Sequence, residues 1–248
     1  MELEGFESVE GIPALYHPET DTLTISDLHL GLEGSMTSEG SYVPKFHLED
    51  MLEDIEKARS RTEASRIVVN GDIKNEFNKS YYSEKDEVRS LVQHLKRRFD
   101  EAVLVRGNHD KFIESTVEDE GLEMQGFFLE EGILYIHGDR KPEEIEDLEE
   151  EEYNTIVIGH EHPALSLKDN LGISEKVDCF LYGETDAGKT IIVLPAFSTI
   201  SNGTEVNEVP QRKLLSPILR EGLNKDSLKA EAVSREAGNF EFPEIGRF

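Results

Sequence analysis

The stretch AVLVRGNHD, residues 102–110, joins a short apolar segment to a polar turn. The apolar part, AVLV, has the length and composition of a buried strand. The turn after it offers an amide, an imidazole and a carboxylate, from Asn108, His109 and Asp110. Gly107 lets the backbone turn sharply and approach a ligand closely. The stretch therefore predicts a ligand-binding loop at the carboxyl end of a strand.

Four further segments have the same form, with polar residues directly after an apolar strand. The apolar strands read TLTIS, RIVVN, ILYI and TIVI, and the polar residues after them are Asp27-Leu28-His29, Gly71-Asp72, His137-Gly138 and Gly159-His160-Glu161-His162. Ligands of open α/β sheets bind at the carboxyl ends of strands, so we expect all five segments to meet at one edge. Because side chains alternate along a strand, Asp27 and His29 should point to the same side. The same spacing holds for His160 and His162.

The residue types in these segments share one chemical use. Carboxylate, imidazole and amide groups are ligands for Mn, Fe, Zn and similar divalent ions, and the segments offer no thiolate. A carboxylate such as Asp72 can bridge two ions. Each short motif is weak by itself, and a single histidine is more often structural than a ligand. The five motifs in order, each at a strand end, favour a metal site.

The remaining sequence alternates strands and helices in its first half and is rich in strands in its second half. Apolar periodicity predicts helices at His47–Ser60 and Glu84–Phe99, and strands at Ala14–Tyr16, Thr22–Ser26, Arg66–Asn70, Phe127–Leu129, Ile133–Ile136, Thr155–Ile158, Ala164–Leu167, Val177–Tyr182, Thr190–Leu194 and Lys229–Val233. The acidic run Glu143–Glu152 follows Pro142, which predicts a solvated helix. This pattern indicates two packed sheets with helices outside, in one domain spanning residues 1–248.

The composition is strongly acidic, with 53 Asp and Glu against 26 Lys and Arg and a net charge of -27. Such a surface repels nucleic acid at low salt, and it would suit a halophilic host with high internal salt. No run reaches the roughly 18 apolar residues of a membrane helix, and the N-terminus MELEGFESVEG does not resemble a signal peptide. We expect a soluble cytoplasmic protein with no membrane partner, in which the single cysteine, Cys179, is buried.

Four other residues have a simpler interpretation. His17 and His47 match no motif and are expected to be non-catalytic, with His17 in a turn. His94 is expected on a solvated helix face. Glu161 lies between two ligand candidates and should point away from the metal site.

The ordered set D-x-H, G-D, G-N-H-D, H and G-H-x-H resembles the calcineurin-like metallophosphoesterase superfamily, and it is complete over residues 27 to 162. The stretches GHEHPALSL, LPAFSTISNGTEVN and FEFPEIGRF resemble a smaller group, the archaeal SbcD-related phosphoesterases, which has a bacterial relative found beside DNA ligase and helicase genes. The resemblance implies an α/β fold: a four-layer αββα sandwich of two mixed β-sheets flanked by helices.

The resemblance also implies roles for the motif residues. One metal ion would be held by Asp27, His29, Asp72 and His162, and a second by Asp72, Asn108, His137 and His160. Two divalent ions are implied, with Mn preferred to Fe, Zn, Co or Ni. A hydroxide shared by the ions would attack a phosphodiester, with His109 as general acid steered by Asp110. Arg106 could bind a substrate phosphate or cap its strand.

The substrate stays open at the level of sequence. Family analogy favours a nuclease acting on DNA or RNA in nucleic-acid processing, with DNA-repair proteins as partners. The acidic charge, and the lack of the DNA-capping and coiled-coil regions of large SbcD nucleases, leave a small-molecule or nucleotide phosphodiesterase or phosphatase as an alternative. The stretch IKNEF after Asp72 lacks the Asp and Arg-Gly of protein phosphatases, which weighs against a phosphoprotein substrate. A metal-binding module that recruits repair proteins with little catalysis is the third alternative.

Overall fold

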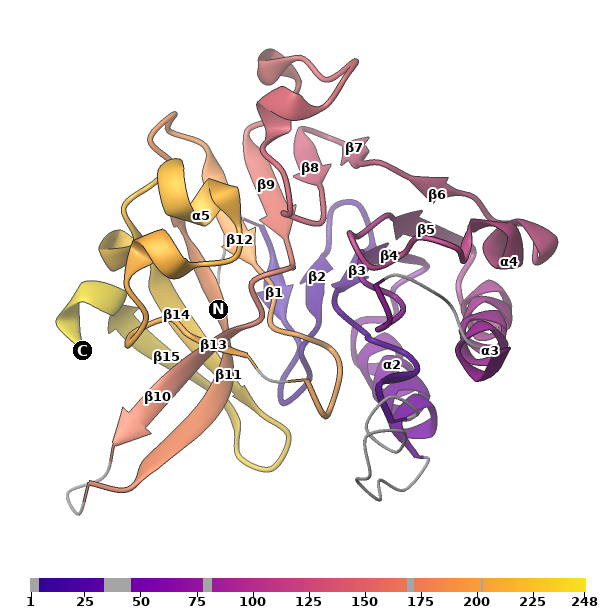
Figure 1. Ribbon diagram of the computed structural model, residues 1–248, viewed down its shortest axis with the longest axis horizontal. Coiled ribbons are helices and arrows are strands. Elements are labelled where there is room, and N and C mark those ends of the chain that lie inside the picture. Colours follow the sequence, from indigo (N-terminus) through magenta and orange to yellow (C-terminus); the bar gives the residue numbers. More distant parts are fainter. Residues whose placement is uncertain (1–4, 34–45, 78–81, 169–171, 202) are drawn as a thin grey trace.

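Two β-sheets lie against each other in the computed structural model of the chain, and helices cover their outer sides (Figure 1). The structure describes residues 5–33, 46–77, 82–168, 172–201 and 203–248. None of the helices in these ranges is long and apolar enough to cross a membrane.

The first sheet has six strands in sequence order, and its last four strands run parallel. The strands are β1 (Glu7–Ser8), β2 (Leu15–His17), β3 (Thr22–Ile25), β4 (Arg66–Asn70), β5 (Glu101–Val105) and β6 (Met124–Gln125). The helices of this half that lie within the described residues include α2 (His47–Thr62), α3 (Tyr82–Arg98) and α4 (Glu114–Asp119). The buried stripe of α2 contains Met51 and Ile55, and that of α3 contains Val88, Leu91 and Leu95. These side chains cover the outer face of the sheet, which buries the apolar face of each helix.

The second sheet runs in the order β13-β10-β11-β12-β9-β8-β7, with β14 beside β11 and β15 beside β14. Its strands are β7 (Phe128–Glu130), β8 (Ile133–Tyr135), β9 (Thr155–Ile158), β10 (Pro163–Lys168), β11 (Ser174–Glu184), β12 (Thr190–Val193), β13 (Thr204–Glu205), β14 (Lys229–Ser234) and β15 (Gly238–Glu244). Strands β8, β9 and β12 are parallel. The outer face is covered by the short helix α5 (Pro217–Glu221) and the 3₁₀ turns η3 (Gln211–Lys213), η4 (Lys225–Ser227) and η5 (Ile245–Arg247).

The inner faces of the sheets share one apolar cluster. It joins Leu15 and Val68 of the first sheet to Tyr135, Phe180 and Ile192 of the second. A buried amide adds a polar link, because Asn70 Nδ2 donates to the carbonyl oxygens of Ile136 at 2.9 Å and Val157 at 3.0 Å. The predicted four-layer αββα sandwich is therefore confirmed, with a thin outer layer of short helical turns on the second sheet.

Two local predictions were wrong. The acidic run Glu143–Glu152 is not an α-helix and carries only the 3₁₀ turns η1 (Pro142–Glu144) and η2 (Glu150–Glu152). Within this run only Ile145 is buried, and like charges at helical spacing repel, so a helix would gain little from packing. His17 lies at the end of β2 and packs on Phe6, not in a turn. The predicted burial of Cys179 is confirmed.

Candidate metal centre

All five polar segments lie where the sequence predicted them, directly after parallel strands. Asp27, Asp72 and Asn108 follow β3, β4 and β5 of the first sheet, while His137 and His160 follow β8 and β9 of the second. Residues from both sheets therefore meet at one place, beside the Asn70 link between the sheets.

The first group of side chains contains Asp27, His29 and His162, whose candidate ligand atoms all lie within 4.8 Å of one another. His162 Nε2 is 3.0 Å from Asp27 Oδ1, and it is 3.1 Å from His29 Nε2. The Nδ1 atom of His29 is buried and has no hydrogen-bond partner within the described ranges. Two imidazoles and a carboxylate thus converge on one small volume.

The second group contains Asp72, His137 and His160, again with candidate ligand atoms within 4.8 Å. His137 Nε2 lies 3.3 Å from Asp72 Oδ2, 3.2 Å from His160 Nδ1 and 3.1 Å from Asn108 Oδ1. Asp72 also belongs to a third group, with His29 and His109. Its carboxylate therefore stands between the two groups, and these donors together suit divalent ions.

The backbone around these residues is unusual. Positive φ angles occur at Asp27 (58°), His29 (50°), Asp72 (50°), His160 (65°) and His162 (46°), none of which is glycine. The side chains do converge, but strand alternation is the wrong reason, because β3 ends at Ile25 and β9 at Ile158. Each such residue costs on the order of 1–3 kcal/mol and persists only where the surroundings hold it. Hydrogen bonds between loops hold these residues, including Asp27 N to Gly71 O at 3.0 Å.

Two glycines allow the loops to approach each other this closely. A Cβ on Gly159 would lie 1.8 Å from Ser26 Oγ and 2.4 Å from Asp27 Oδ2. A Cβ on Gly107 would lie 2.2 Å from Asp72 Oδ1. The sequence predicted that Gly107 lets the backbone approach a ligand; in the structure both glycines let neighbouring loops of the protein pack closely.

The electrostatics of the site divide the histidines into two kinds. Burial, aided by the charge of His162 or His137, lowers the pKa of both His29 and His160 to about 4, so both are neutral at neutral pH. Burial also acts to lower the pKa of His137, but Asp72 and Asp27 outweigh it and raise that pKa to about 10. Asp27 raises the pKa of His162 against burial in the same way. The two carboxylates therefore favour the protonated forms of His137 and His162 in the metal-free site.

His109 lies at the edge of the site, with its side chain 28% exposed. Its Nδ1 donates to the Asn75 carbonyl oxygen at 2.5 Å, and its backbone N–H donates to Asp72 Oδ1 at 2.9 Å. The opposite ring atom, Nε2, is 3.8 Å from Asp72 Oδ2 and faces the site. The contact with Asn75 could not be predicted from the sequence, because a backbone carbonyl has no residue-specific signal.

Asp110, which the sequence predicted to steer His109, follows it directly in the loop after β5. Its buried carboxylate accepts from the backbone N–H groups of Gly107 and Ile73, both at 2.8 Å, and of Lys74 at 3.2 Å. Burial, reinforced by Asp72, raises the pKa of Asp110 to about 6. Asp110 thus ties the loop after β5 to the loop after β4, and it acts on His109 through the backbone.

Three further predictions can be compared with the contacts. Arg106 forms an ion pair with Glu114 at 2.6 Å, and none of the three groups contains it. Glu161 points away from the site, as predicted, and accepts from the backbone N–H of Leu215 at 2.8 Å. His94 was placed wrongly on a solvated face, since its side chain is only 13% exposed and lies 2.8 Å from Glu56.

Two supporting contacts had no sequence signal. Ser201 Oγ lies 3.3 Å from His162 Nδ1, and the Asn70 carbonyl oxygen accepts from His137 Nδ1 at 3.2 Å. Each contact orients an imidazole so that Nε2 points to the carboxylates. His47, expected to be non-catalytic, is buried 2.9 Å from Ser198 Oγ and belongs to none of the groups.

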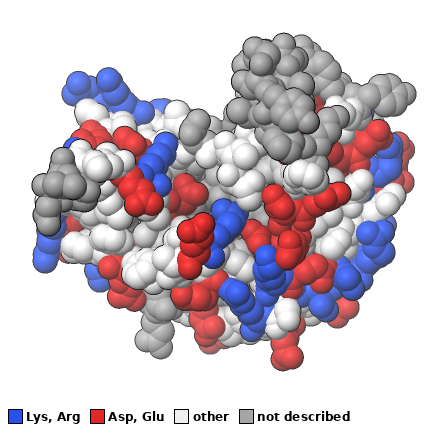
Figure 2. Space-filling model, turned by 90° about the horizontal axis from the view of Figure 1, so that it is seen from below, with Lys and Arg blue, Asp and Glu red and all other residues white. Residues whose placement is uncertain are grey.

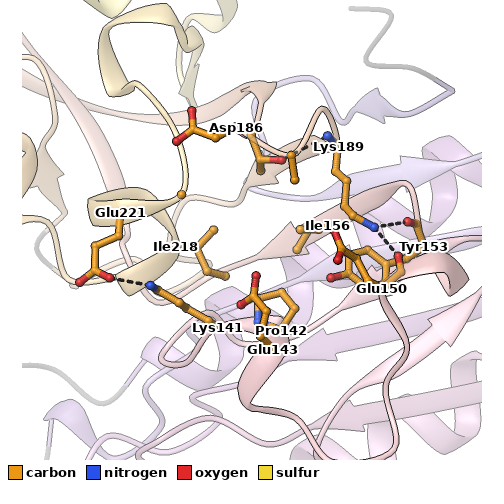
Figure 3. A pocket seen from close by; sticks show the side chains of 13 residues that line it. Lys141, Pro142, Glu143, Glu150, Tyr153, Ile156, Asp186, Lys189, Ile218 and Glu221 are labelled. Carbon is orange, nitrogen blue, oxygen red and sulfur yellow. Dashed lines mark hydrogen bonds and ion pairs between the residues drawn. The ribbon is translucent and has the colours of Figure 1, made fainter.

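A separate cavity of about 230 Å³ lies over the outer face of the second sheet (Figure 3). Its lining includes Lys141, Lys189 and Glu221 and none of the predicted site residues. Lys141 Nζ pairs with Glu221 at 2.5 Å, and Lys189 Nζ donates to the Tyr153 carbonyl oxygen at 2.8 Å. Both ammonium groups thus have protein acceptors, and the metal centre remains the candidate site.

Comparisons with known proteins identify one family model and several similar solved structures. A family model described as calcineurin-like phosphoesterase matches residues 21–172. The solved structure of the nuclease MPE from Pseudomonas putida is similar at a TM-score of 0.61 and 15% identity, over 96% of this chain and 100% of that one. The phosphoesterase Yfce from E. coli has a TM-score of 0.41 at 17% identity, over 74% of this chain and 83% of its own. No curated protein matches the chain.

The family match covers more than half of the sequence and contains every predicted metal-binding residue. The groups of His and Asp around Asp72 supply the divalent-metal site that such chemistry needs. The chain therefore belongs to the calcineurin-like phosphoesterase family and is a metal-dependent hydrolase.

Proposed function

We propose that this protein hydrolyses phosphodiester bonds with two divalent metal ions, Mn²⁺ being the preferred ion. The observation that carries the proposal is the position of Asp72, which belongs to two of the three converging groups and contacts His137 at 3.3 Å. A carboxylate shared in this way can serve two ions at once. Since both sheets contribute ligands, residues 1–248 would act as one domain.

The proposed ligands divide into two sets. Asp27, His29, Asp72 and His162 would hold one ion, and Asp72, Asn108, His137 and His160 would hold the other. Bound there, the ions would supply Lewis acidity toward the phosphate and lower the pKa of a water molecule. The neutral state of His29 and His160 leaves their nitrogen lone pairs available.

The roles of His109, Asp110 and Arg106 concern the substrate and the loop that faces it. With Nδ1 held by the Asn75 carbonyl, His109 would present Nε2 to the phosphate and deliver a proton to the leaving oxygen. Asp110 keeps the His109 loop beside Asp72 through its backbone contacts. Arg106 would reach a substrate phosphate only by leaving Glu114, so we assign it a minor role.

For the substrate we favour nucleic acid, so the protein would act as a nuclease. The similar structure from P. putida is that of a nuclease, and the C-terminal stretches support membership of the SbcD-related group. We propose DNA-repair proteins as partners only by analogy with the SbcD-related group. The acidic composition favours the second candidate, a small diester, because a net charge of -27 disfavours long polyanions.

A substrate panel tests the proposal. Protein stripped of metal should turn over neither bis-p-nitrophenyl phosphate nor oligonucleotides, and added Mn²⁺ should restore both activities. We expect diesters to be cleaved faster than p-nitrophenyl phosphate, and oligonucleotides to be cleaved at high as well as low salt. The variant His94→Ala, altered far from the motifs, should behave as wild type. An absence of Mn²⁺-dependent turnover on every substrate would remove the proposal.

Metal binding should release protons. The pKa of His137 is raised to about 10 in the metal-free protein, so at pH 7 its imidazole holds a proton that an ion must displace. Affinity for Mn²⁺ should therefore rise as pH rises toward 10, by about tenfold per pH unit for each proton released. Calorimetric titration in buffers of different ionisation enthalpy measures the proton count. A binding heat independent of the buffer would contradict the proposed role of His137.

A further inference from the structure

Two exposed phenylalanines lie in the loops after β4 and β5, the loops that carry Asp72 and His109. Phe77 is 38% exposed and Phe112 is 56% exposed. Phe77 ends the described loop after β4, and Phe112 lies two residues after Asp110 in the loop after β5. An exposed aromatic side chain costs free energy in water, and this cost is removed when a ligand covers the ring. The position of Phe77 and Phe112 in two loops of the candidate site therefore points to a ligand that covers them.

The contacts of Phe77 connect it to the chemistry. Its ring meets the His109 imidazole edge-on, with ring centroids 5.3 Å apart and an interplanar angle of 86°. The ammonium of Lys111 lies 4.9 Å from the Phe77 ring centroid. A cation at this distance is attracted to the ring face and is at the same time available to an anion. An aromatic surface and a positive charge are thus both adjacent to the proposed general acid.

The backbone at Phe112 is strained. Its φ angle is 74°, a conformation that is rare for a bulky residue. Such strain is found mainly at functional sites, where the surroundings enforce it. Here the strain leaves the ring in solvent, so it gives no packing benefit in the described structure. The strained backbone, added to the exposure of the ring, supports a loop after β5 that is shaped for a ligand.

The charge of the molecule limits how it can hold a nucleic acid. The chain has a net charge of -27, and on the face drawn in Figure 2 the Lys and Arg side chains are interspersed with Asp and Glu. Counterion release from a basic surface is the usual source of nucleic-acid affinity, and this protein has little of it. Stacking of bases on aromatic side chains is the other main source for single strands, and it needs no net positive charge.

We propose that Phe77 and Lys111 form a stacking platform for an unpaired base next to the scissile phosphodiester, with Phe112 as a further exposed aromatic group in the loop of Lys111. Lys111 contacts an adjacent phosphate, and the base face rests on aromatic carbon. The faces of a base in a duplex are covered by its neighbours, so the platform selects single-stranded nucleic acid. This inference rests on the proposed phosphodiesterase function and names its substrate class.

The test compares a thymidine oligonucleotide with a strand of equal length whose residues are abasic. With Mn²⁺, wild type should cleave the thymidine strand with a kcat/KM about tenfold higher. Phe77→Ala should lose this preference by slowing only the thymidine strand, and Phe77→Tyr should restore it. The matched control is Phe240→Ala, since Phe240 is 49% exposed on β15, in the other sheet. Equal kcat/KM for both strands in wild type, or equal losses on both in Phe77→Ala, would overturn the platform.

Binding separates this inference from the proposed function. Fluorescence anisotropy with Ca²⁺ in place of Mn²⁺ reports affinity without requiring turnover. Wild type should bind the thymidine strand more tightly than the abasic strand, and Phe77→Ala should remove this difference. That result supports the platform whether or not the strands are cleaved. Cleavage of both strands with no base preference in binding supports the phosphodiesterase and overturns the platform.

Discussion

Replacing His109 with alanine should lower kcat on an oligonucleotide by about 10²- to 10⁴-fold while leaving Mn²⁺ binding nearly unchanged. The ring is fixed by a 2.5 Å hydrogen bond from Nδ1 to Asn75 O, which leaves Nε2 facing the site. The leaving group from nucleic acid is an alkoxide, which departs poorly without a proton. His109 belongs to neither proposed ligand set, so its loss should affect the chemical step more than KM.

The leaving group gives this prediction its sharpest control. A p-nitrophenolate leaves without needing a proton, so His109→Ala should lose at least about tenfold less activity on bis-p-nitrophenyl phosphate than on an oligonucleotide. His94→Ala serves as the matched histidine variant, because His94 pairs with Glu56 on the helical side of the sheet. Equal losses on both substrates would show that His109 does not act as the general acid.

Replacing Asp72 with asparagine should have the largest effect of any single substitution, with Mn²⁺ affinity falling by more than about 100-fold and turnover falling to background. The carboxylate is buried between the two groups. One of its oxygens accepts from His109 N–H at 2.9 Å, and the other lies 3.3 Å from His137 Nε2. Asparagine keeps the shape but removes the charge and leaves a single amide oxygen, so it cannot bridge two ions, while the loops keep their packing.

Two measurements separate loss of metal from loss of fold. Calorimetric titration with Mn²⁺ gives the affinity, and thermal unfolding without metal gives the stability. The variant Asp21→Asn is the matched control, since Asp21 accepts from Tyr16 OH at 2.9 Å and from Ser65 N at 3.0 Å in the first sheet. It should lower stability and keep Mn²⁺-dependent turnover. If Asp72→Asn binds two ions as tightly as wild type, Asp72 is not the shared ligand.

The elements that sequence predicted well are those with a long apolar period. Helices α2 and α3 and strands such as β4 and β9 agree with the structure to within a few residues. The elements that were missed are short or polar, including β6 with two residues, α5 with five, and β15, whose residues are mostly exposed or half-buried. The pairing of β6 and β15 is decided by the neighbouring strand, which no local pattern encodes.

The sequence predicted which segments meet at the candidate site, but it did not predict the backbone conformation and side-chain contacts there. Motif order and strand ends identified the five segments. The left-handed backbone at Asp27 and His162 could not be predicted, because neither residue is glycine and the conformation is imposed by the loops around it. Likewise, the contact of His109 Nδ1 with the carbonyl of Asn75 could not be predicted, because a backbone carbonyl is present at every residue.

The meeting of both sheets at the metal centre has a consequence for the lifetime of the protein. Under the proposed ligand sets, each ion joins residues of the first sheet to residues of the second, such as Asp27 to His162. Such an ion acts as a cross-link between distant parts of the chain, and it binds only when the sheets are docked. Protein made under metal starvation would open more often between its halves and meet proteases there. Metal supply would then set how many molecules a cell retains, as well as how fast each one works.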